Sequence, residues 1–560
     1  MKKSACLILT AFVAGCQIIS AQSHKNDTIA RRSVVIERDY TPTIKNVEKL
    51  EINPVITEPE IKKSEVTYSE QVPLLKPDYE VNKWPAAAIH LQQNSYKKGY
   101  AILGFGLYGT ALGDLYYPIV DDASQRLTFD THIHGLFGNT QRQWITNFGL
   151  NYLKHLEAFD LNIGAYFKRN GFNYYGVTGS YFNTFNTNYK DSTNNFINFG
   201  LKAGIQSKGD AEAVAYKANV EYNNFTPGTG LGEQKIHIIG NVDLPVGEYR
   251  LGLNIDDYNL FYSKYNGQQP YPNHSIVGLN PYFNLKGEQW NVRLGLKDYL
   301  SINGNGKSTH LMPDVAAQID LTKAVNLYAG ITGEYDVNSM QKITDENPYI
   351  APALRLDDSY APVKVFGGLK FSPTAGLLLD GSVAYTSYNK QYFFINQRFY
   401  WSGFEPAVAL YQTPILTPVF TAIYDKAKVV TASFNAGYNW KDKIFAHFNA
   451  RYNSWDTKIQ AKAWMKPTTE IEFGGEAKVT RNIFVNANYY FAGGRYACLY
   501  GPESTKMKNV NDLSLGASYS YSDWLTAFVR LNNVFGTKYQ SWYGYNSLGL
   551  NWQIGAAFSF

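Results

Sequence analysis

The chain ends in Leu550-Asn551-Trp552-Gln553-Ile554-Gly555-Ala556-Ala557-Phe558-Ser559-Phe560, a stretch whose side chains alternate in character. Every second residue from Phe560 back to Leu550 is apolar, and the residues between them are small or polar. Because successive side chains of a β-strand point to opposite faces, this period of two predicts a strand with one apolar face.

The same alternation recurs from about residue 96 to the end, with almost no helical pattern in between. Residues 159–168, 430–440 and 525–532 are three further examples. Short connectors such as Lys441-Asp442-Lys443 alternate with long polar or aromatic connections, at about 178–191, 263–272, 338–360, 396–425, 494–510 and 535–548. Short turns that alternate with long loops are typical of a transmembrane β-barrel with periplasmic turns and extracellular loops.

Composition favours this barrel over a soluble β-sandwich, which the alternation alone leaves open. The chain has 44 Tyr, 32 Phe and 10 Trp, more than a soluble core needs but suited to aromatic girdles at the membrane surfaces. We count about 20 or 21 clear strands and a doubtful one at Gly99–Gly106. Since a single-chain bacterial barrel needs an even number, we predict an all-β antiparallel barrel of about 22 strands, with 20 as the alternative.

The composition also excludes several classes of protein. No apolar run after the N-terminus is long enough for a transmembrane helix, and three cysteines make no disulfide framework. A net charge of +5 over 560 residues indicates no nucleic-acid partner. The segment 104–109 matches a dinucleotide fingerprint, but its flanks are strand-like, so we expect no nucleotide and no cofactor. We find no catalytic motif and expect no enzymatic activity.

The N-terminus carries an export signal. Met1-Lys2-Lys3 is followed by an apolar run and a small-residue cleavage site, so residues 1–21 read as a signal peptide. Alternatively, Val13-Ala14-Gly15-Cys16 is a lipobox, with cleavage before Cys16 and lipidation of that cysteine. Residues 22–95 are charged and contain several prolines, which predicts an extended periplasmic segment. Residues 96–560 are the predicted barrel, in the lipid of a Gram-negative outer membrane.

Inward-facing charges are the candidate site residues of the barrel. Asp130, His132 and His134 alternate along one strand, so all three should face the lumen. Their types suit a divalent metal, although i, i+2 side chains splay apart, and polar lumen lining is the other interpretation. The same alternation places charged residues of other strands in the lumen, namely Lys168, Arg451, Arg530, Glu470, Glu472 and Glu476. Such charges select what passes or which segment docks.

The segment Leu531-Asn532-Asn533-Val534-Phe535-Gly536-Thr537-Lys538-Tyr539, followed by a tyrosine-rich stretch and a closing strand, resembles the C-terminal end of TonB-dependent outer-membrane receptors. The resemblance implies that the terminal Phe560 is read by the outer-membrane insertion machinery. It covers the barrel only, because the usual folded N-terminal plug domain does not fit into residues 22–95. Val34-Val35-Ile36-Glu37 faintly resembles the segment that such receptors offer to a TonB-type energy transducer; a strand that docks on a partner or on the barrel rim is the alternative.

Two functions follow from these observations. The resemblance implies a barrel that takes part in nutrient uptake or transport across the outer membrane. The missing plug favours the alternative, a structural or scaffold barrel in an outer-membrane complex, with a lipoprotein or a second barrel subunit as partner. An outer-membrane enzyme is a third class, for which the sequence shows no motif.

Overall fold

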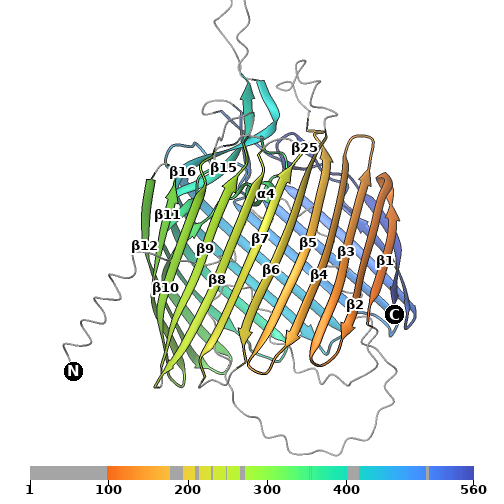
Figure 1. The fold of residues 1–560 in the computed structure, drawn as a ribbon. Coiled ribbons are helices and arrows are strands. Elements are labelled where there is room, and N and C mark those ends of the chain that lie inside the picture. The colour runs from red at the N-terminus through yellow and green to blue at the C-terminus, as the bar shows by residue number, and fades with distance from the viewer. Residues whose placement is uncertain are drawn as a thin grey trace, which may run out of the picture.

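The computed structural model describes residues 98–560, except 177–192, 209–212, 229–230, 248, 265–270, 305, 352–353, 355, 400–414 and 500–502. These residues form one antiparallel 22-stranded sheet closed into a barrel (Figure 1). Its strands are β1 (Tyr100–Gly106), β2 (Thr110–Asp121), β3 (Gln125–Phe137), β4 (Arg142–His155), β5 (Phe159–Asn173), β6 (Thr193–Ser207), β7 (Ala215–Pro227), β8 (Glu233–Val246), β9 (Tyr249–Tyr262), β10 (His274–Lys286), β11 (Trp290–Asn303), β12 (Gly306–Thr322), β13 (Val325–Asp336), β14 (Ser359–Phe371), β15 (Leu377–Phe399), β16 (Ile415–Trp440), β17 (Ile444–Thr457), β18 (Thr469–Lys478), β19 (Ile483–Gly493), β22 (Val510–Ser522), β23 (Leu525–Asn532) and β26 (Asn551–Ser559).

Short elements lie in the connections at one end of the barrel, which we call the loop end; the other is the short-turn end. They are the 3-10 turn η3 (Leu107–Gly109), helix α4 (Met340–Glu346), and two small hairpins made of β20 (Tyr496–Cys498) with β21 (Ser504–Lys506) and β24 (Gln540–Trp542) with β25 (Tyr545–Asn546). Within the described residues, no helix is long and apolar enough to cross a membrane.

The first and last strands close the barrel. β1 pairs with β2 on one side and with β26 on the other, and Gly99 and Phe560 exchange two main-chain hydrogen bonds of 2.8 and 3.0 Å. The doubtful segment at Gly99–Gly106 therefore contains a barrel strand, and the predicted number of 22 is confirmed.

Glycines let the two closing strands approach each other. A Cβ on Gly106 would overlap the carbonyl oxygen of Trp552, and one on Gly555 would overlap that of Leu103. Gly106 of the fingerprint-like segment thus serves strand packing, as expected for close backbone approach in a strand.

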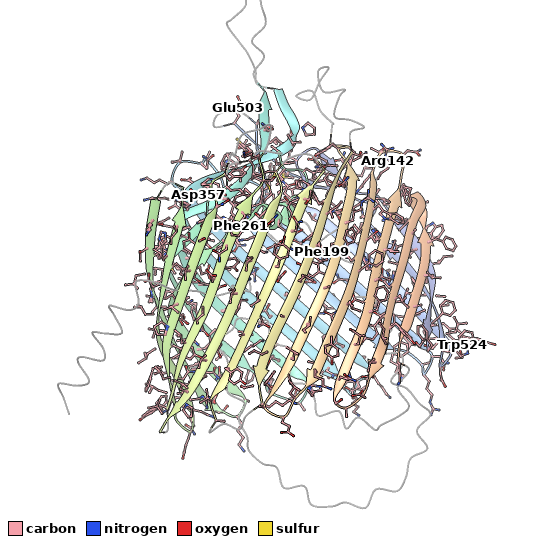
Figure 2. The ribbon with its side chains drawn as sticks, viewed as in Figure 1. Arg142, Phe199, Phe261, Asp357, Glu503 and Trp524 are labelled. Carbon is pink, nitrogen blue, oxygen red and sulfur yellow. The ribbon has the colours of Figure 1, made fainter. Side chains whose placement is uncertain are left out.

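The alternation in the sequence separates an apolar outer wall from a polar inner wall. In β23, Val529 and Leu531 are exposed outward, whereas Phe528 and Arg530, which alternate with them, are buried on the inner side. Figure 2 shows Phe199 on the outer wall, and it is one of many large apolar residues exposed there. An apolar outer band and a polar interior are the expected arrangement of an outer-membrane barrel.

The hairpin of β15 and β16 rises above the rim at the loop end (Figure 1). Its pairing continues up to Phe399 and Ile415, so the predicted long loop at 396–425 is wrong. Both faces of the hairpin are buried there, since Phe393 packs into one apolar cluster and Phe394 into another. Strand segments buried on both faces lose the apolar–polar alternation on which the prediction relied.

Candidate functional site

A segment that we call the strap lies over the loop end of the barrel, between β13 and β14, and its described residues are 337–351, 354 and 356–358. Its helix α4 is anchored to β8: the carboxylate of Glu233 accepts hydrogen bonds from the backbone N–H of Met340 (2.6 Å) and Gln341 (3.4 Å). Ser339 caps the helix by accepting from the Lys342 N–H at 3.1 Å. Glu233 is buried, so this contact fixes where the strap crosses the rim.

After α4 the strap contacts the β15–β16 hairpin and the wall strand β5. Ile350 forms a parallel bridge with Phe420 of β16, in which the Ala351 N–H donates to the Phe420 carbonyl at 2.7 Å. One residue earlier, the ring of Tyr349 lies edge-on to Phe172 of β5, at 5.4 Å between centroids. Because Tyr349 and Ile350 are consecutive, Phe420 in the upper part of the β15–β16 hairpin lies near Phe172 of β5, although β5 and β16 are halfway round the barrel from each other. The strap and the hairpin therefore meet over the mouth, beside β5.

A second connection, residues 533–550, packs on the strap. Tyr545 stacks on Tyr349 at 3.6 Å between centroids, and its hydroxyl donates to the Pro418 carbonyl at 2.6 Å. Tyr175 meets Tyr545 edge-on at 5.1 Å. Burial raises the pKa of Tyr545 well above its usual value, so its hydroxyl stays a donor. We call the strap and the apolar residues packed on it the cap.

A buried ion pair ties the cap to the β17–β18 connection. The Lys466 ammonium lies 3.2 Å from the Glu346 carboxylate, with 6% and 3% of the two side chains exposed. The hydroxyl of Tyr392 also donates to Glu346, and Lys466 lies over the Tyr392 ring at 4.9 Å. A buried pair of this kind is held only while both partners stay in place.

The strap returns to the wall at Asp358, just before β14. Asp358 accepts hydrogen bonds from the Tyr335 hydroxyl (2.6 Å) and the Asn338 N–H (3.2 Å), and His274 lies 3.4 Å away. Burial raises the pKa of Asp358, an effect that the nearby His274 opposes.

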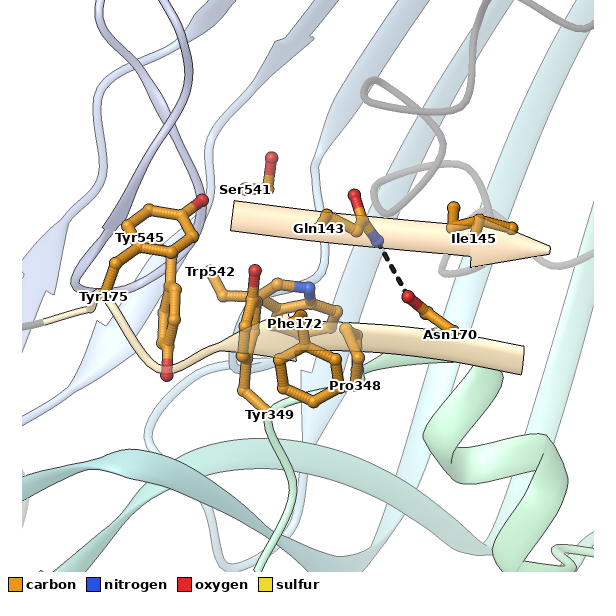
Figure 3. Close-up of a pocket in the computed structure, with 10 residues that line it drawn as sticks. All are labelled: Gln143, Ile145, Asn170, Phe172, Tyr175, Pro348, Tyr349, Ser541, Trp542 and Tyr545. Atoms are coloured by element: carbon orange, nitrogen blue, oxygen red, sulfur yellow. Dashed lines mark hydrogen bonds between the residues drawn. The ribbon is translucent and has the colours of Figure 1, made fainter. Parts of the chain in front are cut away.

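A pocket in the cap offers little room to a ligand. It lies between the upper ends of β4 and β5, the strap and the 533–550 connection (Figure 3). Its polar groups include Gln143, whose amide donates to Asn170 at 3.1 Å. Its rings Phe172, Tyr349 and Tyr545 are buried against one another. The pocket is therefore a crevice between packed rings, without an open aromatic face.

Below the cap, the inner wall is polar and largely charge-paired. Arg293 and Lys297 of β11 lie 2.9 and 3.4 Å from Asp314 of β12. Arg250 pairs with Asp243 at 2.9 Å on the neighbouring strands β9 and β8. The wall thus presents paired ions and amides to the lumen rather than a field of one sign.

The predicted metal residues lie on the inner face of β3 but do not converge. The imidazole of His132 contacts the carboxylate of Asp114 on β2, while Asp130 accepts from the Asn151 amide at 3.2 Å. Among the residues that the structure describes, no three His, Cys, Asp or Glu side chains are placed to hold a metal ion.

The structure places the other predicted residues as follows. Arg530 is buried with its guanidinium over the Phe528 ring at 4.6 Å, and the ammonium of Lys168 lies 5.2 Å from the centre of the Tyr166 ring. Arg451 is paired in register with Glu470 of β18. Phe560 is half-exposed beside Tyr117 at the short-turn end. Cys16 and Val34-Val35-Ile36-Glu37 lie outside the described residues.

Sequence reasoning did not identify the cap. Its residues come from stretches expected to be long loops, and helix α4 has only seven residues, too few to show a helical repeat of apolar side chains. The only usable signal was the aromatic content of these loops, which includes Tyr349, Trp542 and Tyr545.

No protein-family model matches the chain, and a search of curated proteins finds no match. Among solved structures, the barrel is similar to the ferripyoverdine receptor of the outer membrane of Pseudomonas aeruginosa, with a TM-score of 0.60, 14% identity, and 84% of this chain and 72% of that chain covered. It is also similar to a ferric enterobactin receptor mutant from Pseudomonas aeruginosa (TM-score 0.59, 14% identity, 84% and 82% covered) and to the siderophore receptor PirA from Acinetobacter baumannii (TM-score 0.58, 10% identity, 83% and 81% covered).

The fold is that of a siderophore-receptor barrel. The resemblance to the barrel region of TonB-dependent receptors, first carried by residues 531–539, is confirmed at the level of fold. At 10–14% identity the likeness says nothing about what this chain binds.

Proposed function

We propose that this chain is an outer-membrane barrel that takes part in transport, and that its own cap closes it at the cell surface. The observation that carries the proposal is the closed 22-stranded barrel, which shares its fold with outer-membrane receptors over more than four-fifths of the chain. Ferric siderophores are the first substrates to test, because the similar structures are siderophore receptors.

The cap gives the proposal a mechanism. Full burial of an aromatic side chain stabilises by roughly 1.5–3 kcal/mol, so exposing three rings of the cap would cost roughly 5–9 kcal/mol. With an opening free energy of this size, the open state is rarely populated. A substrate or partner must therefore supply the opening free energy by binding the open state more tightly than the closed one.

Planar-bilayer conductance of the purified full chain tests the cap. We expect the wild type to be silent, and a variant whose residues 340–351 are replaced by a short Gly-Ser linker to conduct. Replacing the turn 441–443, at the short-turn end, with three glycines is the control and should stay silent. A conducting wild type would contradict the closed mouth.

Uptake in cells tests transport itself. A strain that lacks the gene should lose accumulation of one labelled substrate, starting with ferric siderophores, and the wild-type gene should restore it. Deleting residues 33–37 should abolish the same uptake without changing the amount of folded barrel if this segment couples to an energy transducer. An unchanged uptake after this deletion would remove the coupling role and leave the barrel's role in transport standing.

A cap over the mouth would also suit the alternative, a scaffold barrel in an outer-membrane complex. In that case the gene deletion leaves uptake of every tested substrate unchanged, and a lipoprotein or second barrel that co-purifies in fixed stoichiometry is released when residues 33–37 are removed. These two results together would replace the transport proposal.

A further inference from the structure

The outer wall between β5 and β11 carries charged residues where an outer-membrane barrel is usually apolar. In β9, Tyr249 and Phe261 are exposed on the outer face, and Asp257 lies on the same face because no register shift interrupts the pairing of β9 with β8 or β10. Asp298 lies at an outward position of β11, in line with the exposed Leu294 and Leu296, but its own side chain is buried. Charged side chains on the lipid face destabilise a barrel and so point to a function.

Asp257 belongs to a hydrogen-bonded group on this outer face. The amide of Asn259 donates to Asp257 Oδ2 at 2.8 Å, and the hydroxyl of Ser275 on β10 donates to Asn259 Oδ1 at 2.7 Å. No residue in the described part of the chain forms an ion pair with Asp257. The group therefore holds a carboxylate in place and supplies no cation for it.

An outward-facing cation lies four strands away. Arg169 shares the outer face of β5 with Ile163, again with no register shift in the pairing of β5 with β4 or β6. Arg169 is exposed, and the described residues provide it with no ion pair. Figure 2 shows the wall between them, on which Phe199 of β6 and Phe261 of β9 are labelled.

β5 and β9 lie at equal distances on either side of β7. A two-fold axis parallel to the barrel axis and passing by β7 would therefore place Arg169 of one copy opposite Asp257 of a second copy. The same symmetry would place Asp257 of the first copy opposite Arg169 of the second. Counted from the short-turn end, Arg169 is the eleventh residue of β5 and Asp257 the ninth of β9, so Arg169 is about two residues nearer the loop end. In a tilted strand this is roughly 5 Å of height, and the long arginine side chain has to cover it together with the gap between the two curved walls.

We propose that two copies of this chain associate in the membrane through β5–β9, with Val220 of β7 at the centre and two reciprocal Arg169–Asp257 ion pairs on either side. This inference goes beyond the proposed function and does not depend on what the barrel transports. The contact removes two charges from lipid and leaves Asp298, four strands from the axis, outside it.

Native mass spectrometry and analytical ultracentrifugation of the full chain in mild detergent and in lipid nanodiscs test this pairing. We expect the wild type to be a dimer and the single charge reversals Asp257→Arg and Arg169→Asp to be mainly monomeric, with at least a tenfold weaker association. The double variant Arg169→Asp/Asp257→Arg should be a dimer again, because the ion pairs are restored in reverse. Heat-modifiable migration on gels verifies that each variant folds.

Asp298→Asn is the control, because it changes a buried carboxylate of β11 that lies outside the contact, and it should leave the dimer unchanged. A monomeric wild type, single reversals that remain dimeric, or a double variant that stays monomeric would each overturn the proposal. A different protein that co-purifies with the wild type and is lost in Asp257→Arg would also overturn it, and would assign this wall to that protein.

Discussion

Lys466 and Glu346 show how single residues hold the cap. Each lies in a different connection, both side chains are almost fully buried, and their charges compensate each other. Replacing one member leaves the other as an uncompensated buried charge, which typically costs about 3–5 kcal/mol. The stability of the cap should therefore depend on this contact far more than on any surface ion pair.

We predict that Lys466→Met loosens the strap while the barrel stays folded. Hydrogen exchange of the amides in residues 340–351 should quicken by at least a hundredfold, since the opening free energy falls by several kcal/mol. Glu346→Gln together with Lys466→Met should exchange more slowly than Lys466→Met alone, because no charge is left unpaired.

Lys390→Met is the matched control at the same rim. Lys390 contacts Asp357 at 2.8 Å, but its side chain is 52% exposed, so the pair contributes about 0–1 kcal/mol. Equal exchange rates in Lys466→Met and Lys390→Met would contradict the role given to the buried pair.

At the scale of elements, the meeting of β1 and β26 depends on residues without side chains. We predict that Gly106→Ala lowers the fraction of barrel that closes, because the added Cβ collides with the main chain of Trp552 and costs about 1–3 kcal/mol or more. The measurement is the fraction of protein that migrates as the compact, heat-modifiable form after refolding into detergent.

Gly113→Ala provides the comparison on the adjacent strand β2. A Cβ there meets its nearest neighbours, in Ile133 and Leu103, at 3.8 and 4.0 Å, which is ordinary contact. The Gly113→Ala protein should fold like the wild type. If both variants lose a similar fraction of compact barrel, the loss does not come from the close approach at Gly106.

The elements also show where sequence patterns suffice. Strands with one face in lipid and one toward the lumen alternate strictly, as in β23 and β26, and these were predicted from their residues. β15 and β16 near the rim lie between two apolar clusters, so Phe393 and Phe394 are both buried and the pattern disappears. Helix α4 was missed because a tertiary contact, from Glu233, stabilises a helix too short to form on local propensity alone.

At the scale of the molecule, all 22 strands and every pairing between them lie within residues 100–559. We therefore predict that a chain of residues 96–560 refolds in detergent to the same heat-modifiable barrel as a chain of residues 22–560. Circular dichroism and thermal unfolding should agree between the two within a few degrees. A shorter chain that aggregates or gives a markedly lower Tm would mean that residues 22–95 complete the barrel.

The whole-molecule features that the sequence could not provide are those made by distant contacts. Alternation and connector lengths predict a 22-stranded antiparallel barrel, because both are local properties of the chain. The stacking of Tyr349 on Tyr545 joins residues nearly two hundred positions apart, and no local pattern records it. For the same reason, the inward-facing charges were predictable one by one, whereas their partners across the lumen wall were not.

Gly99 and Phe560 are hydrogen-bonded neighbours at the short-turn end, so the junction of the first and last strands is paired like the junctions between the other strands. A circular permutant that joins these two residues and opens the chain at the turn 441–443 would keep every strand beside its present neighbours. The order of the strands in the chain then affects only synthesis and membrane insertion. The folded wall is a closed ring of paired strands, so the chain termini could be moved to any of its short turns.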